Sequence, residues 1–559
     1  MSANGEYIVA CNGVKLKEEA KNPHYIELEY HEGRNKNVNI SLQKFVTSVY
    51  STSKRVKDLL EIAGYIFAAD RESSRGTPNS VEYQSWSRSF HFHIKVRDYR
   101  FWNNGEVQYL LSDLLCFTTG DKSYKFTFYK GADDFPADLF DNEKFELDTK
   151  KGLSITLFSG GLDSLAGAIE RLESTKDEIC LVSHQSGQPS VKQTQSKLFE
   201  TLNKLYPNRC KHYKFHCGLS HTKSIDETQR TRAFLFNSMA FAIANTYKQD
   251  RIYVYENGIT SLNFAKTQDM MNGRASRTTH PKTIRLLEKL FTKIAEKGYK
   301  IEHPYLFNTK TDILKIIKRY KKLKIIDSAV SCSATRNKPP QKTHCGICSQ
   351  CIDRRFAVYS SELERFDENG LYHFNFLKED IDEPLTIKAL NDYIRLAQSF
   401  AEENPDTFYM NRADQISEIE EFIDGEKDSD RIKKLYDLST KHSKDIEYAL
   451  QRIENIYYKP FTKARPRSFY NLILRPRTYQ EKTEADDKAS QRKLIKKFLI
   501  ENYPEFITKP IDNVSKTARE YVKKYHPELI GEEMKKKRGV IRTELTSIRS
   551  GNALLKLNN

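Results

Sequence analysis

The sequence lacks an apolar run long enough to cross a membrane, and its first residues lack the basic and apolar regions of a secretory signal peptide. Internal repeats and low-complexity tracts are also missing. Nine cysteines in 559 residues are too few for a disulfide framework. We therefore expect a soluble, cytoplasmic protein without membrane contacts. At about 150 residues per domain, its length predicts roughly three or four domains.

The chain also has no G-x-x-x-x-G-K-[ST] sequence, which excludes a Walker-type phosphate loop. It does contain Ser159-Gly160-Gly161-Leu162-Asp163-Ser164, which follows the apolar run Ile155–Phe158 and precedes apolar residues at helical spacing. This pattern predicts a strand, a tight glycine turn and a helix. Glycine lets a backbone approach an anion closely, and a helix N-terminus offers unpaired N–H groups. We therefore interpret the turn as a phosphate cradle in which Ser159 and Ser164 add hydroxyl donors.

Strand and helix patterns divide the chain into four regions. Residues 1–150 show short strand patterns and one helical stretch, Phe45 to Ala69, which is typical of an α+β domain. Residues 151–365 alternate strands with helices, which predicts an α/β domain with a parallel sheet. Residues 366–462 have a helical pattern, and residues 463–559 form a basic helical region. At the carboxyl ends of the parallel strands we expect the glycine turn, His184 and the tripeptide that begins at Glu256.

Four of the cysteines are concentrated between residues 332 and 351. Cys345, Cys348 and Cys351 have C-x-x-C-x-x-C spacing, and Cys332 lies upstream, so together they can close a tetrahedral thiolate site. Four protein ligands leave no open position, which favours a structural Zn²⁺. His344 is the alternative fourth ligand, and an iron–sulfur cluster is the alternative metal group. The remaining cysteines are interpreted as buried or incidental: Cys11, Cys116, Cys180, Cys210 and Cys217.

Positive charge dominates the chain, with a formal net charge of +16. From Pro460 onward there are about 23 Lys and Arg residues against about 12 Asp and Glu residues, so about +11 of the charge lies there. This basic region, with Lys535–Arg538, is compatible with a nucleic acid, an acidic protein partner or an ordinary solvated surface. His91 and His93 share one strand face without acidic or cysteine neighbours, so we interpret them as surface or packing residues rather than metal ligands.

The string from Ser159 to Ser164 resembles the SGGxDS signature of the PP-loop ATP pyrophosphatases, a Rossmann-like family of the HUP (adenine nucleotide α-hydrolase-like) type that adenylates a substrate and releases pyrophosphate. The resemblance implies ATP and Mg²⁺. By this resemblance the pyrophosphate is bound by Ser159, Gly160, Gly161, Leu162 and Ser164. Asp163 organises the turn and the associated Mg²⁺ ion. His184 is a candidate for contact with the adenine or for a base, and packing is the other interpretation of a histidine at a strand end.

Together, the glycine turn and the cysteine cluster resemble QueC, the 7-cyano-7-deazaguanine synthase family of the queuosine pathway, over residues 154–363. Members adenylate the carboxylate of 7-carboxy-7-deazaguanine, capture ammonia and then dehydrate the amide. An acyl-AMP carries a good leaving group, whereas a free carboxylate is a poor electrophile. Arg232 and Arg277 are candidates to bind the phosphates or the carboxylate; Lys310 and Arg336 are weaker ones.

The chain departs from QueC after the predicted fourth strand, where the strings that begin at Glu256 and at Ser276 replace the family's Tyr-Pro-Asp-Cys-Arg elements. These strings resemble divergent QueC-like subunits of bacterial anti-phage operons, such as the Qat system and type IV CBASS. That branch implies a deazaguanine-like substrate joined to an amine, in some cases on a partner protein of the same operon. The alternatives are a tRNA-modifying PP-loop enzyme and a non-catalytic scaffold that binds a partner or nucleic acid.

Overall fold

The computed structural model separates the chain into two compact units, Met1–Leu474 and Arg475–Asn559. The structure describes residues 6–17, 21–29, 37–45, 53–75, 87–132, 140–145, 152–185, 189–219, 230–264, 277–333, 339, 341–425, 427–458, 464–474, 495, 498, 499, 501–503, 513–527, 529 and 531–549. Each unit is considered below by itself.

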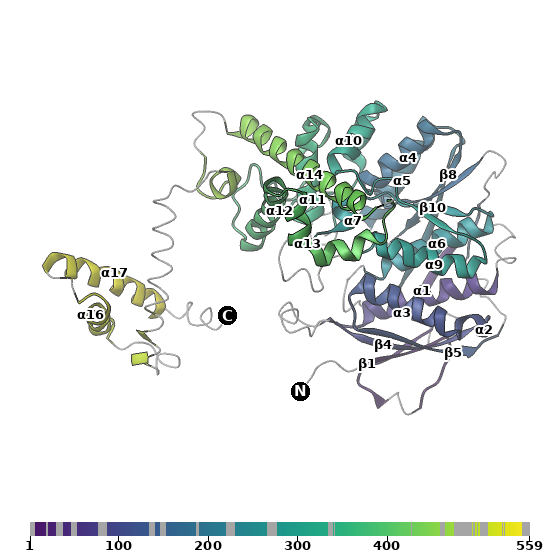
Figure 1. Cartoon of the computed structure of the whole chain (residues 1–559), viewed down its shortest axis with the longest axis horizontal. Coiled ribbons are helices and arrows are strands. Elements are labelled where there is room, and N and C mark those ends of the chain that lie inside the picture. Colours follow the sequence, from purple (N-terminus) through teal and green to yellow (C-terminus); the bar gives the residue numbers. More distant parts are fainter. Residues whose placement is uncertain are drawn as a thin grey trace. The chain divides into compact units, whose positions relative to one another are not determined.

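A parallel sheet of four strands lies at one side of the first unit, in the order β2-β1-β4-β5 (Figure 1). Alternation along β4 and β5 puts Phe90, Phe92, Phe126 and Phe128 in the hydrophobic core, and helices α1 and α3 cover the sheet. The Ser53 side chain caps α1 by accepting from the Val56 N–H. The bounds are β1 (Glu6–Cys11), β2 (Tyr25–Leu28), β4 (Ser89–Val96), β5 (Ser123–Lys130), α1 (Lys54–Glu72), α2 (Tyr99–Trp102) and α3 (Gly105–Thr119).

A second sheet has seven strands in the order β11-β10-β7-β8-β9-β3-β6. The five strands from β11 to β9 run parallel, β3 pairs antiparallel with β9, and β6 is parallel to β3. Strands β7 and β8 are buried along their whole length, as expected for a sheet covered on both faces. The bounds are β3 (Val38–Phe45), β6 (Phe140–Phe145), β7 (Leu153–Leu157), β8 (Glu178–His184), β9 (Cys210–Leu219), β10 (Arg251–Tyr253) and β11 (Lys300–Glu302).

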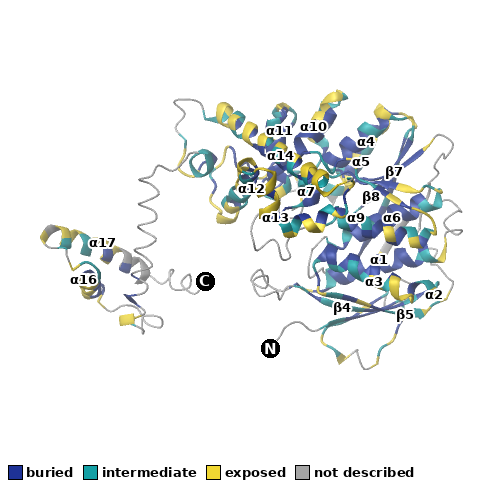
Figure 2. Cartoon of the chain, viewed as in Figure 1, coloured by how far each residue is buried: buried dark blue, intermediate teal, exposed yellow. Residues whose placement is uncertain are grey.

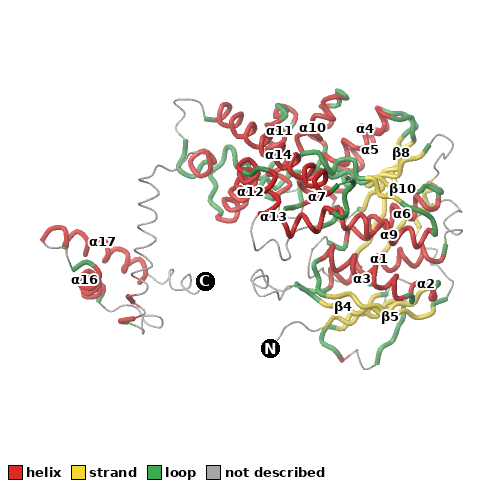
Figure 3. Tube along the Cα trace, in the orientation of Figure 1, coloured by secondary structure: helices red, strands yellow, loops and turns green. Residues whose placement is uncertain are grey.

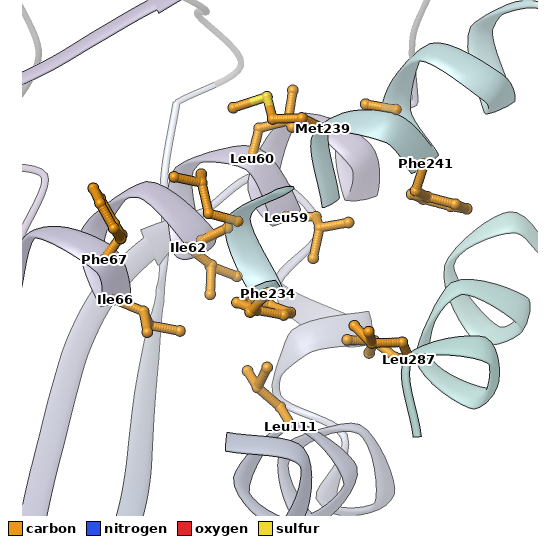
Figure 4. Close-up of a cluster of buried hydrophobic side chains, with 14 of the residues drawn as sticks. Leu59, Leu60, Ile62, Ile66, Phe67, Leu111, Phe234, Met239, Phe241 and Leu287 are labelled. Atoms are coloured by element: carbon orange, nitrogen blue, oxygen red, sulfur yellow. The ribbon is translucent and has the colours of Figure 1, made fainter. Parts of the chain in front are cut away.

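Four helices fill the space between the two sheets. Helices α6 (Arg232–Thr246) and α9 (Pro281–Ala295) lie against the seven-stranded sheet and pack on α1 and α3 (Figure 1). Figure 4 shows Phe234 of α6 among side chains from α1 and α3. The dark blue of α1 and α6 in Figure 2 reflects this burial on almost every side. One continuous hydrophobic core therefore joins the two sheets.

The other face of the seven-stranded sheet is covered by α4 (Leu162–Ser174), α5 (Pro189–Leu205) and α10 (Lys310–Arg319). A group of helices beside them (Figure 3) consists of α11 (Ser349–Ser360), α12 (Pro384–Glu402), α13 (Pro405–Glu420) and α14 (Asp428–Tyr457), with the short α7 (Gly258–Leu262) packed on α14. The second unit contains α16 (Val514–Tyr525) and α17 (Gly531–Arg549) around a small core of its own.

The predicted α/β class with a parallel sheet is confirmed. The helix expected from Phe45 to Ala69 begins at Lys54 instead, because Ser53 is its N-cap, and Phe45 is the last residue of strand β3. Strands β3 and β6 precede residue 150 yet pair within the seven-stranded sheet. The domain boundaries near residues 150, 365 and 462 stay predictions. In the part of the chain that the structure describes, no helix has the length and apolar character needed to span a membrane.

Candidate functional site

The Ser-Gly-Gly turn lies at the carboxyl end of β7, between two parallel neighbours of the sheet. Gly160 has a φ of +86°, in the left-handed region that favours glycine, and its carbonyl accepts a hydrogen bond from the Val330 N–H at 2.9 Å. Helix α4 then begins at Leu162, with Gly161 as an N-cap whose lack of a side chain leaves the cap without a side-chain hydrogen bond. The positive end of the α4 dipole therefore borders this turn.

Hydroxyl groups surround the first turn of α4. Ser159 Oγ lies 3.2 Å from Ser164 Oγ and accepts from the Gly161 N–H at 3.3 Å. Ser331 Oγ accepts from the Leu162 N–H at 3.5 Å. Because these contacts are long for hydrogen bonds, an anion that accepts from the same N–H groups could replace them at little cost.

Four buried or partly buried charges, here called the Lys310 cluster, lie beside the turn: Asp163, Glu256, Lys310 and Asp353. The Lys310 Nζ donates to Asp163 Oδ1 at 2.7 Å and lies 4.0 Å from one oxygen each of Glu256 and Asp353. Asp163 Oδ2 accepts from both the backbone N–H and the side-chain amide of Asn257, at 3.0 and 2.9 Å. One ammonium therefore faces three carboxyl groups, which come from α4, α11 and the end of β10.

These contacts shift the pKa values in opposite directions. Burial by itself would raise the pKa of Asp163, but the Lys310 ammonium and the hydrogen bonds to the carboxylate lower it to about 2. Glu256 lies beside that carboxylate, and burial together with the Asp163 charge holds its pKa well above the usual value. Burial opposes the charge on Lys310, yet the neighbouring carboxylates raise its pKa. The cluster thus favours a charged Asp163–Lys310 pair and a protonated Glu256.

Two cavities open at this end of the sheet. The first, of about 260 Å³, is bordered by the glycine turn, α5, Lys310 and the segment from Val330 to Ser333. The second, of about 270 Å³, is bordered by α6, the end of β10, Thr278 and Thr279. Four residues line both cavities: Ser159, Arg232, Tyr255 and Glu256. A ligand in one cavity would therefore meet a ligand in the other across these shared residues.

Arg232 begins α6 and is the cation that the described residues contribute to both cavities. Burial lowers its pKa. Its position depends on Thr231, whose hydroxyl donates to Asp70 Oδ2 of α1 at 2.6 Å. Asp70 in turn accepts from Arg88 at 2.5 Å. The region before residue 150 therefore holds the N-terminus of α6 in place beside the cavities.

That anchor belongs to a second group of buried charges, here called the Arg88 cluster: Asp70, Arg75, Arg88 and Asp121. The two guanidinium groups each contact both carboxylates, at 2.5 to 3.3 Å. The burial of Asp121 favours its neutral form, but Arg88 and Arg75 outweigh this effect and lower its pKa to about 2. Two positive and two negative charges balance within this cluster.

The four predicted cysteine ligands converge. The sulfur atoms of Cys332, Cys345, Cys348 and Cys351 all lie within 4.8 Å of one another, and two of the pairs are 3.9 and 4.0 Å apart. A tetrahedral zinc site with Zn–S bonds of about 2.3 Å places its sulfurs about 3.8 Å apart. Backbone N–H groups of Cys345 and Cys348 donate to cluster sulfurs at 3.4 Å. The group therefore fits a metal such as zinc.

Residues around the cysteines support that geometry. Gly346 has a φ of +91°, and a Cβ there would lie 1.8 Å from the Phe374 carbonyl oxygen, so only glycine fits. His344, the alternative ligand, contacts Thr343 Oγ1 at 2.8 Å and stacks on Tyr372, and it is not part of the converging group. Because Cys332 also lines the first cavity, a metal at this group would fix one wall of that cavity.

The described residues offer no set of ligands for the expected Mg²⁺ ion that is comparable to the cysteine group. Both oxygens of Asp163 already accept hydrogen bonds, from Lys310 and Asn257. Within the described ranges, the cysteine group is the one cluster of three or more ligand-type side chains that could hold a metal. The assignment of Asp163 to Mg²⁺ stays a prediction, and no step proposed below depends on it.

Other predicted site residues lie elsewhere. His184 is 1% exposed, stacks on Phe215, and is not among the described residues that line the two cavities. Burial holds its pKa well below the usual value, which agrees with packing as a neutral side chain. Arg277 lies over the Phe117 ring at 4.6 Å and pairs with Glu418 at 3.7 Å. Ser276 and Arg336 are outside the described residues.

Two cavity residues, Lys310 and Asn237, were ranked low or missed by the sequence-based predictions. Lys310, only a weaker candidate there, is central to the cluster, and its signal was the capping box from Thr309 to Asp312 that starts α10 after β11. Asn237 had no signal, because it is a single polar residue within the apolar helix α6. No protein-family model matches the chain, and no curated protein has a matching sequence. The function is therefore inferred from the residues and their geometry.

Proposed function

We propose that the chain is an ATP-dependent ligase of the QueC type, with a PP-loop fold. It adenylates a 7-deazaguanine-type carboxylate, releases pyrophosphate, and passes the acyl group to ammonia or to an amine. The observation that carries the proposal is the glycine turn at the carboxyl end of β7, beside two cavities that share Ser159, Arg232, Tyr255 and Glu256. Ligands bind at this edge in open parallel sheets.

The first cavity suits the phosphates of ATP. Its walls include the N-terminus of α4, the Ser159 and Ser331 hydroxyls, and Lys310 and Arg232 as cations. N–H groups and cations that are fixed before the reaction stabilise developing negative charge without reorganisation. The cysteine group, loaded with structural zinc, would hold the wall from Val330 to Cys332 against the glycine turn, where Val330 donates to Gly160.

The chemistry has two balanced steps. A carboxylate oxygen of the substrate attacks the α-phosphorus, the bond to the β-phosphate oxygen breaks, and pyrophosphate leaves with the bonding electron pair. The nitrogen of an amine then attacks the acyl carbon, the bond to AMP breaks, and the amine loses one proton. Glu256, the carboxyl group that lines both cavities among the described residues, is placed to take up that proton once it is ionised. Arg232 is placed to face the carboxylate and the α-phosphate.

The proposal also covers the amine that accepts the acyl group and the anti-phage operon in which the enzyme acts. The strings after Glu256 and Ser276 resemble the anti-phage branch, so the acceptor includes an amine on a partner protein of the same operon. A tryptic digest of co-expressed operon proteins would carry the deazaguanine mass on one peptide, detected by mass spectrometry. Adducts that form equally well with a turnover-deficient variant would exclude this enzyme as their source.

The direct experiment supplies the purified chain with 7-carboxy-7-deazaguanine, an ammonium salt and ATP labelled at the α-phosphate. The expected products are AMP and pyrophosphate, formed in equal amounts and only with the carboxylate present. Release of ADP and phosphate, or no consumption of ATP, would contradict the proposal.

Gly161→Ala is the sharpest variant for this assay. The new Cβ would meet Ser159 Oγ at 3.4 Å and Val330 O at 3.7 Å, both ordinary contacts, so the fold should accept it. The methyl group would nevertheless stand where the phosphates approach the backbone, and a misplacement of about 1 Å costs about 100-fold in rate. Gly105→Ala is the matched control, since its Cβ meets nothing within 4 Å at the start of α3. Equal rates for the two variants would argue against the phosphate assignment.

A further inference from the structure

The second cavity differs in character from the first. Its walls combine the apolar side chains of Leu157, Val254 and Phe236 with the hydroxyls of Thr278 and Thr279. Lys310, Leu162 and Asp163, which line the first cavity, are not among its described lining residues, although Ser164 of α4 is. Aliphatic and aromatic walls together with fixed polar groups are typical of sites that hold the ring of a small molecule.

Asn237 is a buried polar residue that lines the second cavity and not the first. The residue is 2% exposed, and its Nδ2 donates to the Ala233 carbonyl oxygen at 2.9 Å, one helical turn earlier in α6. That bond fixes the orientation of the amide, with the other amide atom, Oδ1, left as an acceptor. Oδ1 receives no hydrogen bond from the described residues. A buried acceptor without a donor is destabilising, so a ligand that supplies the donor binds more tightly.

We propose that the second cavity binds a planar nitrogen heterocycle whose ring N–H or amino group donates to Asn237 Oδ1. The rings of Phe236 and Tyr255 line the cavity and offer faces for stacking, and Arg232 stands at the boundary with the first cavity. Bound in this way, the heterocycle directs its carboxylate or phosphate substituent toward Arg232 and the glycine turn. Asn237 then selects ligands by the N–H group that they carry.

Two molecules of the proposed reaction have this chemistry: the carboxylate substrate and the adenine nucleotide. The inference rests on the proposed function in naming these two sources, but binding can be measured without turnover. The probes are therefore 7-carboxy-7-deazaguanine and AMP, each titrated separately into the full-length chain by isothermal titration calorimetry.

Asn237→Leu keeps the branched shape of the side chain but removes both the Oδ1 acceptor and the Nδ2 donor to Ala233. It should weaken the binding of one of the two probes about tenfold or more, the size expected for one lost hydrogen bond in a buried site. The probe that loses affinity identifies which molecule occupies the cavity. Ser238→Ala is the matched control, because Ser238 is the next residue of α6, is fully buried, has no hydrogen-bond partner in the described part of the chain, and is not among the cavity residues.

The ratio of the affinities for the unmodified probe and its N-methylated analogue does not depend on the folded fraction of the sample. Wild-type protein should prefer the unmodified probe about tenfold over its N-methylated analogue, and Asn237→Leu should bind the two equally. If that variant does not fold, the preference of the wild type decides the question alone. The inference is overturned if the wild type binds neither probe, if it shows no preference, or if Asn237→Leu leaves both affinities unchanged.

The two proposals fail separately. Binding that depends on Asn237 without formation of AMP and pyrophosphate would refute the adenylating function and leave the heterocycle site in place. Full turnover by Asn237→Leu with an unchanged KM for both ATP and the carboxylate would refute the heterocycle site and leave the adenylating function in place. Neither ligand would then depend on the cavity residue.

Discussion

The Arg88 cluster and the Lys310 cluster both bury four charged groups in the first unit, yet they differ in charge balance. In the Arg88 cluster, two guanidinium groups neutralise two carboxylates, and all four residues are at most 8% exposed. In the Lys310 cluster, one ammonium faces three carboxyl groups, and one of them, Glu256, is 29% exposed. The balanced cluster is anchored between α1 and the four-stranded sheet, whereas the unbalanced one borders both cavities.

This difference separates a structural role from a chemical one. A buried charge that has its full set of partners is costly to disturb and offers nothing to a ligand. An excess of carboxyl groups beside one ammonium leaves one group whose protonation can change, as the raised pKa of Glu256 indicates. Four experiments test this contrast.

The largest loss of stability is expected for Arg88→Met. It leaves the carboxylates of Asp70 and Asp121 with one cation instead of two, and breaking such a buried pair costs about 3–5 kcal/mol. Urea unfolding measures the change. Lys125→Met, which removes an exposed pair with Glu6 on the same sheet, should cost less than about 1 kcal/mol. Turnover per folded molecule should change less than about threefold in Lys125→Met, because Lys125 pairs with Glu6 and takes no part in the Arg88–Asp70–Thr231 contacts beside Arg232.

Lys310→Met should act mainly on turnover. Loss of a preorganised cation in the first cavity is expected to slow the formation of AMP by about 100- to 1000-fold. The rate is measured with labelled ATP on protein whose folded fraction is known from circular dichroism. Lys322→Met removes a cation that pairs with Glu173 away from the cavities, and serves as the control. If Lys310→Met formed AMP at the wild-type rate, the Lys310 cluster would have a structural role like that of the Arg88 cluster.

One carboxyl group of each cluster, Asp121 and Glu256, should respond to pH with opposite signs, whereas Asp163 of the Lys310 cluster has the same sign as Asp121. Asp121 has a pKa of about 2 in the folded chain and about 3.8 when unfolded, so its contribution exists above pH 3.8 and is lost as the pH falls toward 2. Asp121→Asn should remove this loss of unfolding free energy at acid pH, which amounts to about 2 kcal/mol. Glu256 has a raised pKa, so its contribution exists below pH 4.5 and is lost as the pH rises through the folded value. Glu256→Gln should therefore gain stability relative to the wild type above pH 4.5, which unfolding curves across pH would detect.

The smallest effect is expected for Arg277→Gln. The Arg277 side chain is 26% exposed and its partner Glu418 is 45% exposed, so the loss of their pair at 3.7 Å should cost less than about 0.5 kcal/mol. The structure places this arginine on Phe117, apart from the lining of the two cavities. The rate of AMP formation should stay within twofold of the wild type. A large fall in the rate would support a catalytic role for Arg277.

The features that could be predicted are those encoded by neighbours in the chain. The strand, glycine turn and helix around Ser159 follow from local apolar spacing and from the need for glycine at a positive φ. The cysteine group follows from C-x-x-C-x-x-C spacing within one short segment, and its sulfurs do converge. The roles assigned to isolated residues stay predictions: His184 is packed on an aromatic ring, and Arg277 lies over Phe117.

The sequence by itself thus determined the parallel α/β class, the glycine turn and the four-cysteine group, because each depends on residues close together in the chain. Only the tertiary structure decided that Lys310 pairs with Asp163 across 147 positions, and that Asp70 of α1 anchors the α6 terminus that carries Arg232. It also brought Asn237 to a cavity wall. The partner of a buried charge or amide is set by how distant elements pack, and local sequence patterns carry no record of that packing.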